Sequence, residues 1–457
     1  MDTCLQSATH LASRIRNGSL SSRELTNAYL DRIDRLNPAL NAVVTIDRER
    51  ALEEADAADA AGPGGPLHGL PITIKDAIEV AGMRSTGGAM ALRDFVPPVD
   101  APVVARLRRA GAIVIGKTNV PEWSGDIQTY NQVFGTTNNP WDQSVTTGGS
   151  SGGPAAAVAA GLSSFEVGTD IGGSIRIPSS YCGVCGHKPS YGIIPQRGYL
   201  DSVGGGTTDA DINVFGPIAR SVEDLSLLLD VMAGPVAEDA VGWRLELPPA
   251  RHSSLADYRV GLWLDDPACR VDSGALALME AAAAEMARAG AQVTDARPPL
   301  DLAEVRSLFE SLLIPAISPS HDGELGQALG GNHRIWLDQN RARAAVRQVW
   351  ADWFRNFDVL LCPVMPMLPF PHDQAGSVAD RVVQINGEAR PQSLTLAWTG
   401  LVGVAYLPAT VVPVGRVGDL PVGMQIVGPF LEDRTPLFVG AALTDLLGGY
   451  MPPPQFT

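Results

Sequence analysis

The chain is poor in cysteine and has no long uninterrupted apolar run. Its five cysteines form an odd, sparse set in 457 residues, which excludes a disulfide framework and favours a reducing compartment. No apolar stretch reaches the length of about 18 residues that is needed to span a bilayer. The N-terminal segment also lacks the apolar core of a signal peptide. These absences predict a cytoplasmic protein without a membrane partner.

Positive charge is scarce as well. The 34 Lys and Arg residues are outnumbered by 50 Asp and Glu residues, and the formal net charge is −16. An acidic surface repels nucleic-acid phosphates, so we expect no nucleic-acid partner. The same charge disfavours anionic lipid, and its simplest role is to keep the protein in solution.

Apolar residues make up 45% of the chain, which is enough for a sizeable core. Ser21 and Glu24 form a capping box that predicts the start of a helix. Short apolar runs predict buried strands at residues 70–74 and 164–168, the second leading into a turn at 169–173. Further helices are expected over residues 101–110, 154–161 and 273–289, and further strands over 113–115, 407–414 and 422–427. This rhythm predicts an α/β architecture with a substantial sheet and covering helices.

Three segments, residues 69–76, 147–153 and 168–178, carry the candidate chemistry. Lys75 ends a buried strand, where lost hydration would lower its pKa and allow the neutral amine to act as a base. A Gly-Gly-Ser turn lets the backbone approach a substrate and aims N–H groups into one concavity, which stabilises an oxyanion. Ser174 ends this turn and is placed to attack a carbonyl held there.

Each segment alone has an ordinary structural interpretation. A lone lysine at a strand end is usually solvated, and Gly-Ser segments are usually turns. A phosphate loop is disfavoured because the chain contains no Gly-x-x-x-x-Gly-Lys-Ser/Thr. None of the seven histidines lies in the three segments, and Ser174 is not in a Gly-x-Ser-x-Gly elbow, so a Ser-His-Asp site is not indicated.

Together, the three segments resemble the signature of the amidase signature family. They occur in the family's order, and the match continues at residues 182–189, 358–366 and 420–429. The resemblance covers nearly the whole chain. It implies a single large α/β domain over residues 1–457, with a twisted mixed β-sheet covered by helices on both faces. The signature core would span about 70–200 and a variable substrate-pocket region about 235–400.

The resemblance implies an amidase that hydrolyses a carboxylic amide C–N bond through an acyl-enzyme. Ser174 would be the nucleophile, and Ser150, preceded by a cis peptide bond, would pass its proton to neutral Lys75. The oxyanion hole would consist of the backbone N–H groups of Ile171, Gly172, Gly173 and Ser174. No cofactor or metal is implied. The expected partner is a small-molecule amide substrate, with a homodimer left open.

Neighbouring residues favour structural roles. We expect Arg176 to pair with Asp170 rather than with a substrate carboxylate. Cys182 and Cys185 form a Cys-x-x-Cys without a second ligand pair, and two buried thiols are the better interpretation. His187 is expected to be packed or on the surface, since the relay needs no histidine.

The substrate pocket is expected near residues 305–345 and 398–400. Apolar side chains at Leu308, Phe309, Leu312, Leu313 and Ile314 suggest an apolar or aryl acyl group, although a core helix has the same spacing. Four aromatic residues are candidates for the lining, with core packing as the alternative: Trp123, Tyr130, Trp336 and Trp398.

Two other functions stay open. The first is the A subunit of a tRNA-dependent amidotransferase, a glutaminase that passes ammonia to a partner protein. Residues 123–142 and the C-terminal end resemble that protein less. The second is a catalytically silent binding protein on the same scaffold, which the presence of Lys75, Ser150 and Ser174 disfavours.

Overall fold

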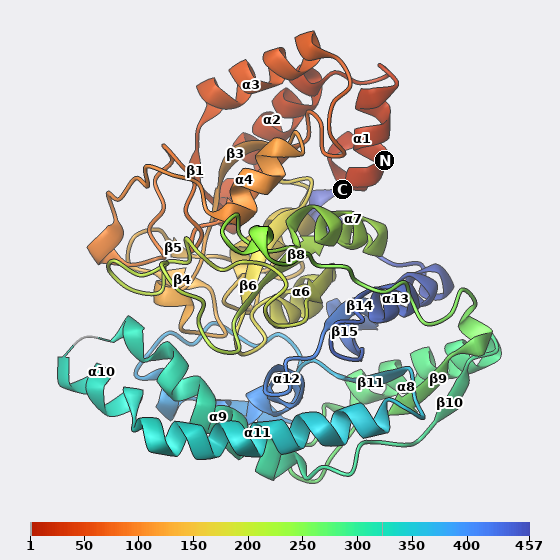
Figure 1. Ribbon diagram of the computed structural model, residues 1–457. Coiled ribbons are helices and arrows are strands. Elements are labelled where there is room, and N and C mark those ends of the chain that lie inside the picture. The colour runs from red at the N-terminus through yellow and green to blue at the C-terminus, as the bar shows by residue number, and fades with distance from the viewer. Residues whose placement is uncertain (1, 322) are drawn as a thin grey trace.

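The computed structural model describes residues 2–321 and 323–457. Its largest sheet has eight strands in the order β10-β9-β11-β15-β14-β7-β8-β6, with parallel and antiparallel pairs (Figure 1). The strands are β6 (Glu166–Asp170), β7 (Cys185–Lys188), β8 (Val214–Ala219), β9 (Arg259–Leu262), β10 (Gln292–Thr294), β11 (Val359–Pro363), β14 (Ala409–Val417) and β15 (Leu420–Val427). The predicted mixed α/β architecture is confirmed.

Helices pack on both faces of this sheet, as the alternation of side chains along β14 shows. Thr410 and Val412 lie against Gly440 of α13 (Arg434–Leu447). Val411 points the other way and packs with Ile177 of α6 (Arg176–Cys182). Helix α13 also contacts α7 (Val222–Met232) and α8 (Ser273–Arg288), and α6 contacts α5 (Gly152–Ala159).

A second sheet of three strands, in the order β1-β3-β2, lies in the N-terminal part of the chain. Its strands are β1 (Val43–Ile46), β2 (Pro71–Lys75) and β3 (Ile113–Thr118), and the nearby helices are α1 (Ala8–Arg16), α2 (Ser22–Leu40), α3 (Arg48–Ala61) and α4 (Pro102–Arg109) (Figure 1). The predicted capping box opens α2, with Ser21 and Glu24 making both reciprocal hydrogen bonds. Asp2 and the Phe456 carbonyl both bind Arg32, so the two chain ends lie side by side.

The two sheets meet at β2 and β6, where side chains join them. Thr73 N donates to Ser163 Oγ at 2.9 Å. The hydroxyls of Thr73 and Thr118 donate to Glu166 Oε1 at 2.6 and 2.7 Å. We call this junction the seam, and Lys75 stands at its end.

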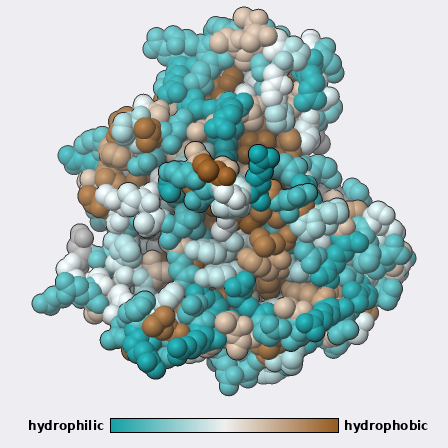
Figure 2. Space-filling view, in the orientation of Figure 1, coloured by the Kyte–Doolittle hydropathy of each residue, from teal (hydrophilic) through white to brown (hydrophobic). Residues whose placement is uncertain are grey.

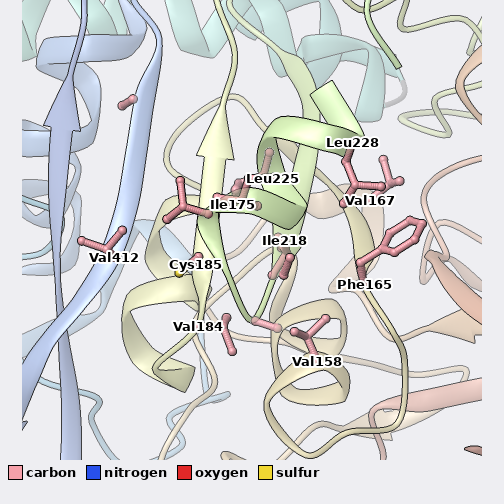
Figure 3. Close-up of a cluster of buried hydrophobic side chains, with 14 of the residues drawn as sticks. Val158, Phe165, Val167, Ile175, Val184, Cys185, Ile218, Leu225, Leu228 and Val412 are labelled. Atoms are coloured by element: carbon pink, nitrogen blue, oxygen red, sulfur yellow. The ribbon is translucent and has the colours of Figure 1, made fainter. Parts of the chain in front are cut away.

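The hydrophobic core continues beside the seam. Val167 of β6 and Ile218 of β8 lie between Val158 of α5 and Leu225 of α7 (Figure 3). The sequence placed a turn from Thr169, which is wrong, because β6 continues to Asp170. Pairing of these last two residues with Phe215 and Val214 of β8 extends the strand.

The remaining helices form one end of the molecule (Figure 1). They are α9 (Leu302–Ile317), α10 (Gly323–Gly330), α11 (His333–Trp353) and α12 (Ala397–Gly403). Two small hairpins complete the fold: β4 (Tyr130–Asn131) with β5 (Gly135–Thr136), and β12 (Val382–Ile385) with β13 (Glu388–Pro391). Among the described residues, no helix combines the length and apolarity that a bilayer-spanning segment requires.

Candidate active site

Lys75 ends β2 as a fully buried side chain. Its Nζ lies 2.7 Å from Ser150 Oγ, 2.8 Å from Thr169 Oγ1 and 3.1 Å from Ser151 Oγ. Burial lowers the pKa of Lys75 well below its usual value, and the charges of Asp170 and Glu166 oppose this only in part. An amine with a lowered pKa that is surrounded by hydroxyls is the arrangement that a proton-accepting lysine needs.

Ser150 lies in a tightly packed loop that leads into α5. The Gly149–Ser150 peptide bond is cis, as the family resemblance implies. A Cβ on Gly149 would lie 2.5 Å from the Asp126 carbonyl oxygen, and one on Gly153 would lie 2.3 Å from that of Asn119. These two glycines therefore let the loop and the start of α5 pack directly against neighbouring backbone.

Ser174 follows β6 and is 8% exposed. Its carbonyl oxygen accepts a hydrogen bond from Ser151 N at 3.1 Å, which joins the two serine segments through their main chains. No hydrogen bond between Ser174 Oγ and Ser150 Oγ is found among the described side chains. The structure thus contains the first link of the predicted relay, from Lys75 to Ser150, and brings the backbone of Ser174 beside it.

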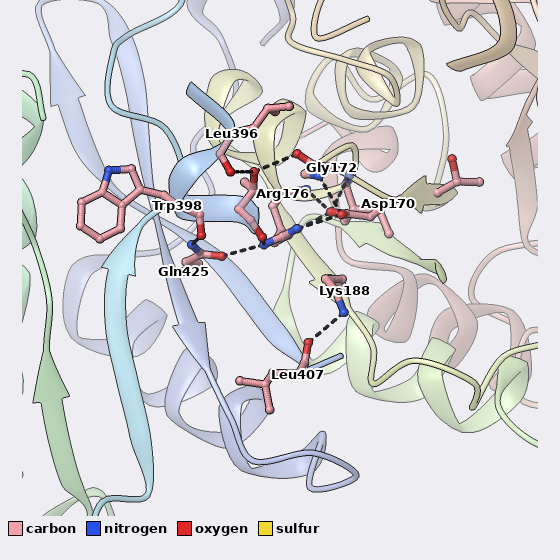
Figure 4. Close-up of polar contacts among 12 residues, drawn as sticks. Asp170, Gly172, Arg176, Lys188, Leu396, Trp398, Leu407 and Gln425 are labelled. Atoms are coloured by element: carbon pink, nitrogen blue, oxygen red, sulfur yellow. Dashed lines mark hydrogen bonds and ion pairs between the residues drawn. The ribbon is translucent and has the colours of Figure 1, made fainter. Parts of the chain in front are cut away.

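Asp170 holds the turn that carries Ser174. Its carboxylate accepts from Gly173 N at 2.8 Å and Ile175 N at 3.1 Å, and it pairs with Arg176 at 2.9 Å (Figure 4). Burial raises the pKa of Asp170, but the charge and hydrogen bonds of Arg176, the charge of Lys188 and the Ile175 N–H together outweigh it and leave the value at about 2. Arg176 also donates to the Thr399 carbonyl and to Gln425 Oε1. The predicted Asp170–Arg176 pair is confirmed.

This arrangement involves one of the four N–H groups that were expected in the oxyanion hole. The Gly173 N–H is already used by Asp170, so it is not free to bind a substrate oxygen. In the described part of the chain, the N–H groups of Ile171, Gly172 and Ser174 have no internal acceptor. Three of the four expected donors remain available.

A cavity of about 430 Å³ adjoins Ile171. It is lined by Glu122, Trp123, Ser124, Gly125, Ile171, Tyr199, Asp201, Ala210, Ala316, Ile317, Ser320, His321 and Leu325. One side of it therefore comes from the end of α9 and from α10, within the region where the sequence placed the pocket. The other side comes from Ile171 and from loops at residues 122–125 and 199–210, of which the sequence analysis named only Trp123 as a lining candidate.

The individual pocket residues were predicted less well. Trp123 lines the cavity, but Trp398 is fully buried and donates from Nε1 to the Cys269 carbonyl at 3.2 Å. Phe309 and Leu312 are also buried, and Phe309 packs behind Gly172. Within residues 308–314, Phe309 and Leu312 belong to the core, whereas Ile314 is 43% exposed, and the cavity lining begins at Ala316.

Other candidates have structural surroundings. Cys182 and Cys185 are buried free thiols, as expected, and burial raises the pKa of each. His187 is buried between Thr410 and Asp433. Its packed position agrees with the prediction that it takes no part in a relay.

Comparison with known proteins extends over almost the whole chain. The protein-family model described as Amidase matches residues 24–320 and 323–437. The A subunit of the glutamyl-tRNA(Gln) amidotransferase of Thermus thermophilus is 34% identical, covering 93% of this chain and 94% of that protein. The indoleacetamide hydrolase of Bradyrhizobium diazoefficiens is 34% identical, and the match covers 97% of this chain and 86% of that protein. The crystal structure of a bacterial aryl acylamidase of the amidase signature family matches this fold with a TM-score of 0.82 at 28% identity. The match covers 97% of this chain and 96% of that chain.

Proposed function

Because this chain belongs to the amidase signature family of amide-hydrolysing enzymes, we propose that it cleaves linear carboxylic amides with Ser174, Ser150 and Lys75. The observation that carries the proposal is the 2.7 Å contact between the buried Lys75 Nζ and Ser150 Oγ. A buried lysine with a lowered pKa is a competent base at neutral pH.

In the proposed acylation, Ser174 Oγ attacks the amide carbonyl carbon. Its proton passes to Ser150 Oγ as the proton of Ser150 passes to Lys75 Nζ. Because both hydroxyls and the amine lie in a buried region, no bulk water needs to reorganise during the transfer. The tetrahedral oxyanion forms next to the turn at residues 171–174.

The N–H groups of Ile171, Gly172 and Ser174 stabilise that oxyanion in this proposal. Asp170 contributes indirectly, because its hydrogen bonds to Gly173 N and Ile175 N fix the shape of the turn. Preorganised donors of this kind are usually the largest electrostatic contribution to acyl transfer. Asp170 is therefore a positioning residue.

Collapse of the intermediate breaks the C–N bond and needs a proton on the leaving nitrogen. The Lys75 ammonium returns the proton through Ser150, which distinguishes amide cleavage from the easier ester cleavage. Water then attacks the acyl carbon and passes a proton through Ser150 to Lys75. As the bond between that carbon and Ser174 Oγ breaks, the proton returns through Ser150 to Ser174 Oγ. Lys75 ends the cycle neutral, and the products are a carboxylic acid and an amine.

The cavity next to Ile171 is the proposed binding place for the variable part of the substrate. Its volume of about 430 Å³ suits a small molecule, and Trp123 and Tyr199 give it aromatic walls. Two similar proteins carry names that specify indoleacetamide and aryl acylamides. Aryl and aralkyl amides are accordingly the first substrates to test.

A glutaminase like the amidotransferase relative is the second candidate, since that relative is 34% identical over 93% of this chain. Such an enzyme must hold the charged α-carboxylate of glutamine. The described lining of the cavity contains no Arg or Lys that would pair with it. This absence of a cationic partner favours the general amidase.

The test combines active-site labelling with turnover. Wild-type protein should react with a fluorophosphonate probe, release amine from a panel of aryl and alkyl amides, and show weak or no ammonia release from glutamine. The Ser174→Ala variant should neither label nor turn over while keeping its unfolding midpoint. Labelling that persists in Ser174→Ala refutes the nucleophile assignment, and absence of labelling in the wild type favours a silent binding protein.

A further inference from the structure

The cavity beside Ile171 has an unusual segment in its lining. Trp123 and Ser124 adopt left-handed backbone conformations, with φ of 52° and 58°. Two consecutive non-glycine residues in this region are uncommon, and each costs on the order of 1–2 kcal/mol. Such strain persists where the surrounding structure enforces it, and it is concentrated at binding and catalytic sites.

Ser124 is one of the polar residues that line the cavity. Ser124 is only 9% exposed, and its Oγ is buried without a hydrogen-bond partner. Leaving a buried hydroxyl unpaired costs about 1–3 kcal/mol. A bound molecule that hydrogen-bonds to this oxygen would remove that penalty.

The charges in the lining have one predominant sign. Asp201 and Glu122 both face the cavity, whereas no Arg or Lys is found among its described lining residues. Burial raises the pKa of Tyr199 to about 12, the nearby hydroxyl of Ser124 opposes this rise, and the charge of Asp201 adds to it. Ser124, Tyr199 and Asp201 all line the same cavity.

We propose that this cavity selects amides whose variable group ends in a primary ammonium and discriminates against those ending in a carboxylate. Ser124 Oγ accepts an ammonium N–H, Asp201 and Glu122 supply the attraction, and the rings of Trp123 and Tyr199 accommodate the cation. The net charge of −16 acts in the same direction at longer range. This inference rests on the proposed function, because Ile171 connects the cavity to the turn that carries Ser174.

The experiment uses para-nitroanilides whose acyl chains have equal length and end in ammonium, methyl or carboxylate. A parallel series places the same three groups on the amine side of an aryl amide. We expect kcat/KM to decrease in that order, with about a tenfold or larger difference between ammonium and carboxylate in one series. Equal values in both series, or a preference for carboxylate, would overturn the inference.

Three variants locate the selectivity. Asp201→Asn should reduce the ratio of ammonium to methyl substrate by about fivefold. Glu280→Gln is the matched control, because it removes the same charge from an exposed position on α8 and should leave the ratio unchanged. Ser124→Ala should raise KM for the ammonium substrate more than KM for the methyl substrate. An unchanged ratio in Asp201→Asn contradicts the inference.

Binding to the inactive protein separates this inference from the proposed function. Calorimetric titration of Ser174→Ala with the three compounds should show the same order of affinity as the turnover assay. If wild-type protein hydrolyses none of them but the binding order holds, the proposed function is wrong and the cation-selective cavity stands. If binding shows no dependence on charge, the cavity assignment is wrong whatever the turnover.

Discussion

The catalytic segment, residues 147–190, and the outer helices, residues 302–353, meet across one cavity but differ in burial. Every residue of the catalytic segment is buried except Ile171 and Gly172, and the first of these borders the cavity. In the outer helices, α10 has no buried residue and α11 has three, Arg343, Trp350 and Trp353. Figure 2 shows a mostly hydrophilic surface over these helices.

The difference indicates how chemistry and selectivity are divided in this protein. In the proposed relay, proton transfer would depend on the 2.7 Å contact between Lys75 Nζ and Ser150 Oγ, and complete burial keeps that geometry fixed. An exposed helix that touches the substrate can change its side chains at little cost in stability. Variants in the two regions should therefore separate effects on rate from effects on selectivity.

The largest expected effect is that of Ser174→Ala in the catalytic segment. Removing a nucleophile should reduce kcat for amides by about five orders of magnitude. Ser307→Ala is the matched control, since this serine is exposed on α9, and it should change kcat by less than about twofold. Steady-state kinetics on one aryl amide compares the two. Near-normal turnover by Ser174→Ala would place the chemistry elsewhere.

Lys75→Met should cost about three orders of magnitude in amide hydrolysis, because the base and the returned proton are both lost. The loss on the matching ester should be smaller, since an alkoxide leaves more easily than an amine. Parallel assays of an amide and ester with the same acyl group measure the difference. Equal losses on both would count against a relay that returns the proton.

The same variant tests the protonation of Lys75 through stability. Burial lowers the pKa of Lys75 in the folded state. At any pH between this folded-state pKa and the ordinary pKa of an unfolded lysine, the unfolded state therefore binds more protons than the folded state. Stability of the wild type should therefore increase with pH through this window, relative to Lys75→Met. Urea unfolding of both proteins from about pH 6 to pH 10 gives the difference. A difference that does not change with pH would show a charged lysine in the folded protein.

Two glycine substitutions compare packing in the two regions. A Cβ on Gly153 of α5 would lie 2.3 Å from the Asn119 carbonyl oxygen, so Gly153→Ala should lower the free energy of unfolding by about 3 kcal/mol or more. On Gly330 of α10 the nearest atom is Ser318 Oγ at 3.4 Å, so Gly330→Ala should be neutral or stabilise by up to about 1 kcal/mol. Denaturant unfolding measures both. Equal effects would remove the contrast in packing.

The sequence alone predicted several elements of the fold. The run before Lys75 has the apolar character of a buried strand, and β2 ends at that lysine. Capping by Ser21 and Glu24 and the amphipathic pattern of α8 are local signals, and the structure confirms both elements. These features depend on residues close together in the chain, so periodicity and spacing were sufficient.

The rest depends on contacts between distant segments, which one sequence does not reveal. No local pattern indicates that Arg176 reaches the Thr399 carbonyl and Gln425 Oε1, or that Trp123 and Ser124 are forced into left-handed conformations. Tyr199 and Asp201 line the cavity because a loop returns to it, and no spacing marks them. The apolar spacing around Phe309 predicted a helix correctly but could not separate its core side from its cavity side.

The smallest expected effect on stability belongs to Leu325→Ser in α10, and it tests the comparison most directly. Leu325 lines the cavity but is 57% exposed, so the free energy of unfolding should change by less than about 0.5 kcal/mol. Loss of apolar contact should still raise KM for a bulky aryl amide by about threefold, and leave acetamide unaffected. Leu337→Ser is the control, an exposed leucine of α11 outside the cavity lining. If both variants change KM for the aryl amide equally, or if neither changes it, α10 does not contribute to selectivity. The selectivity would then have to come from the catalytic segment.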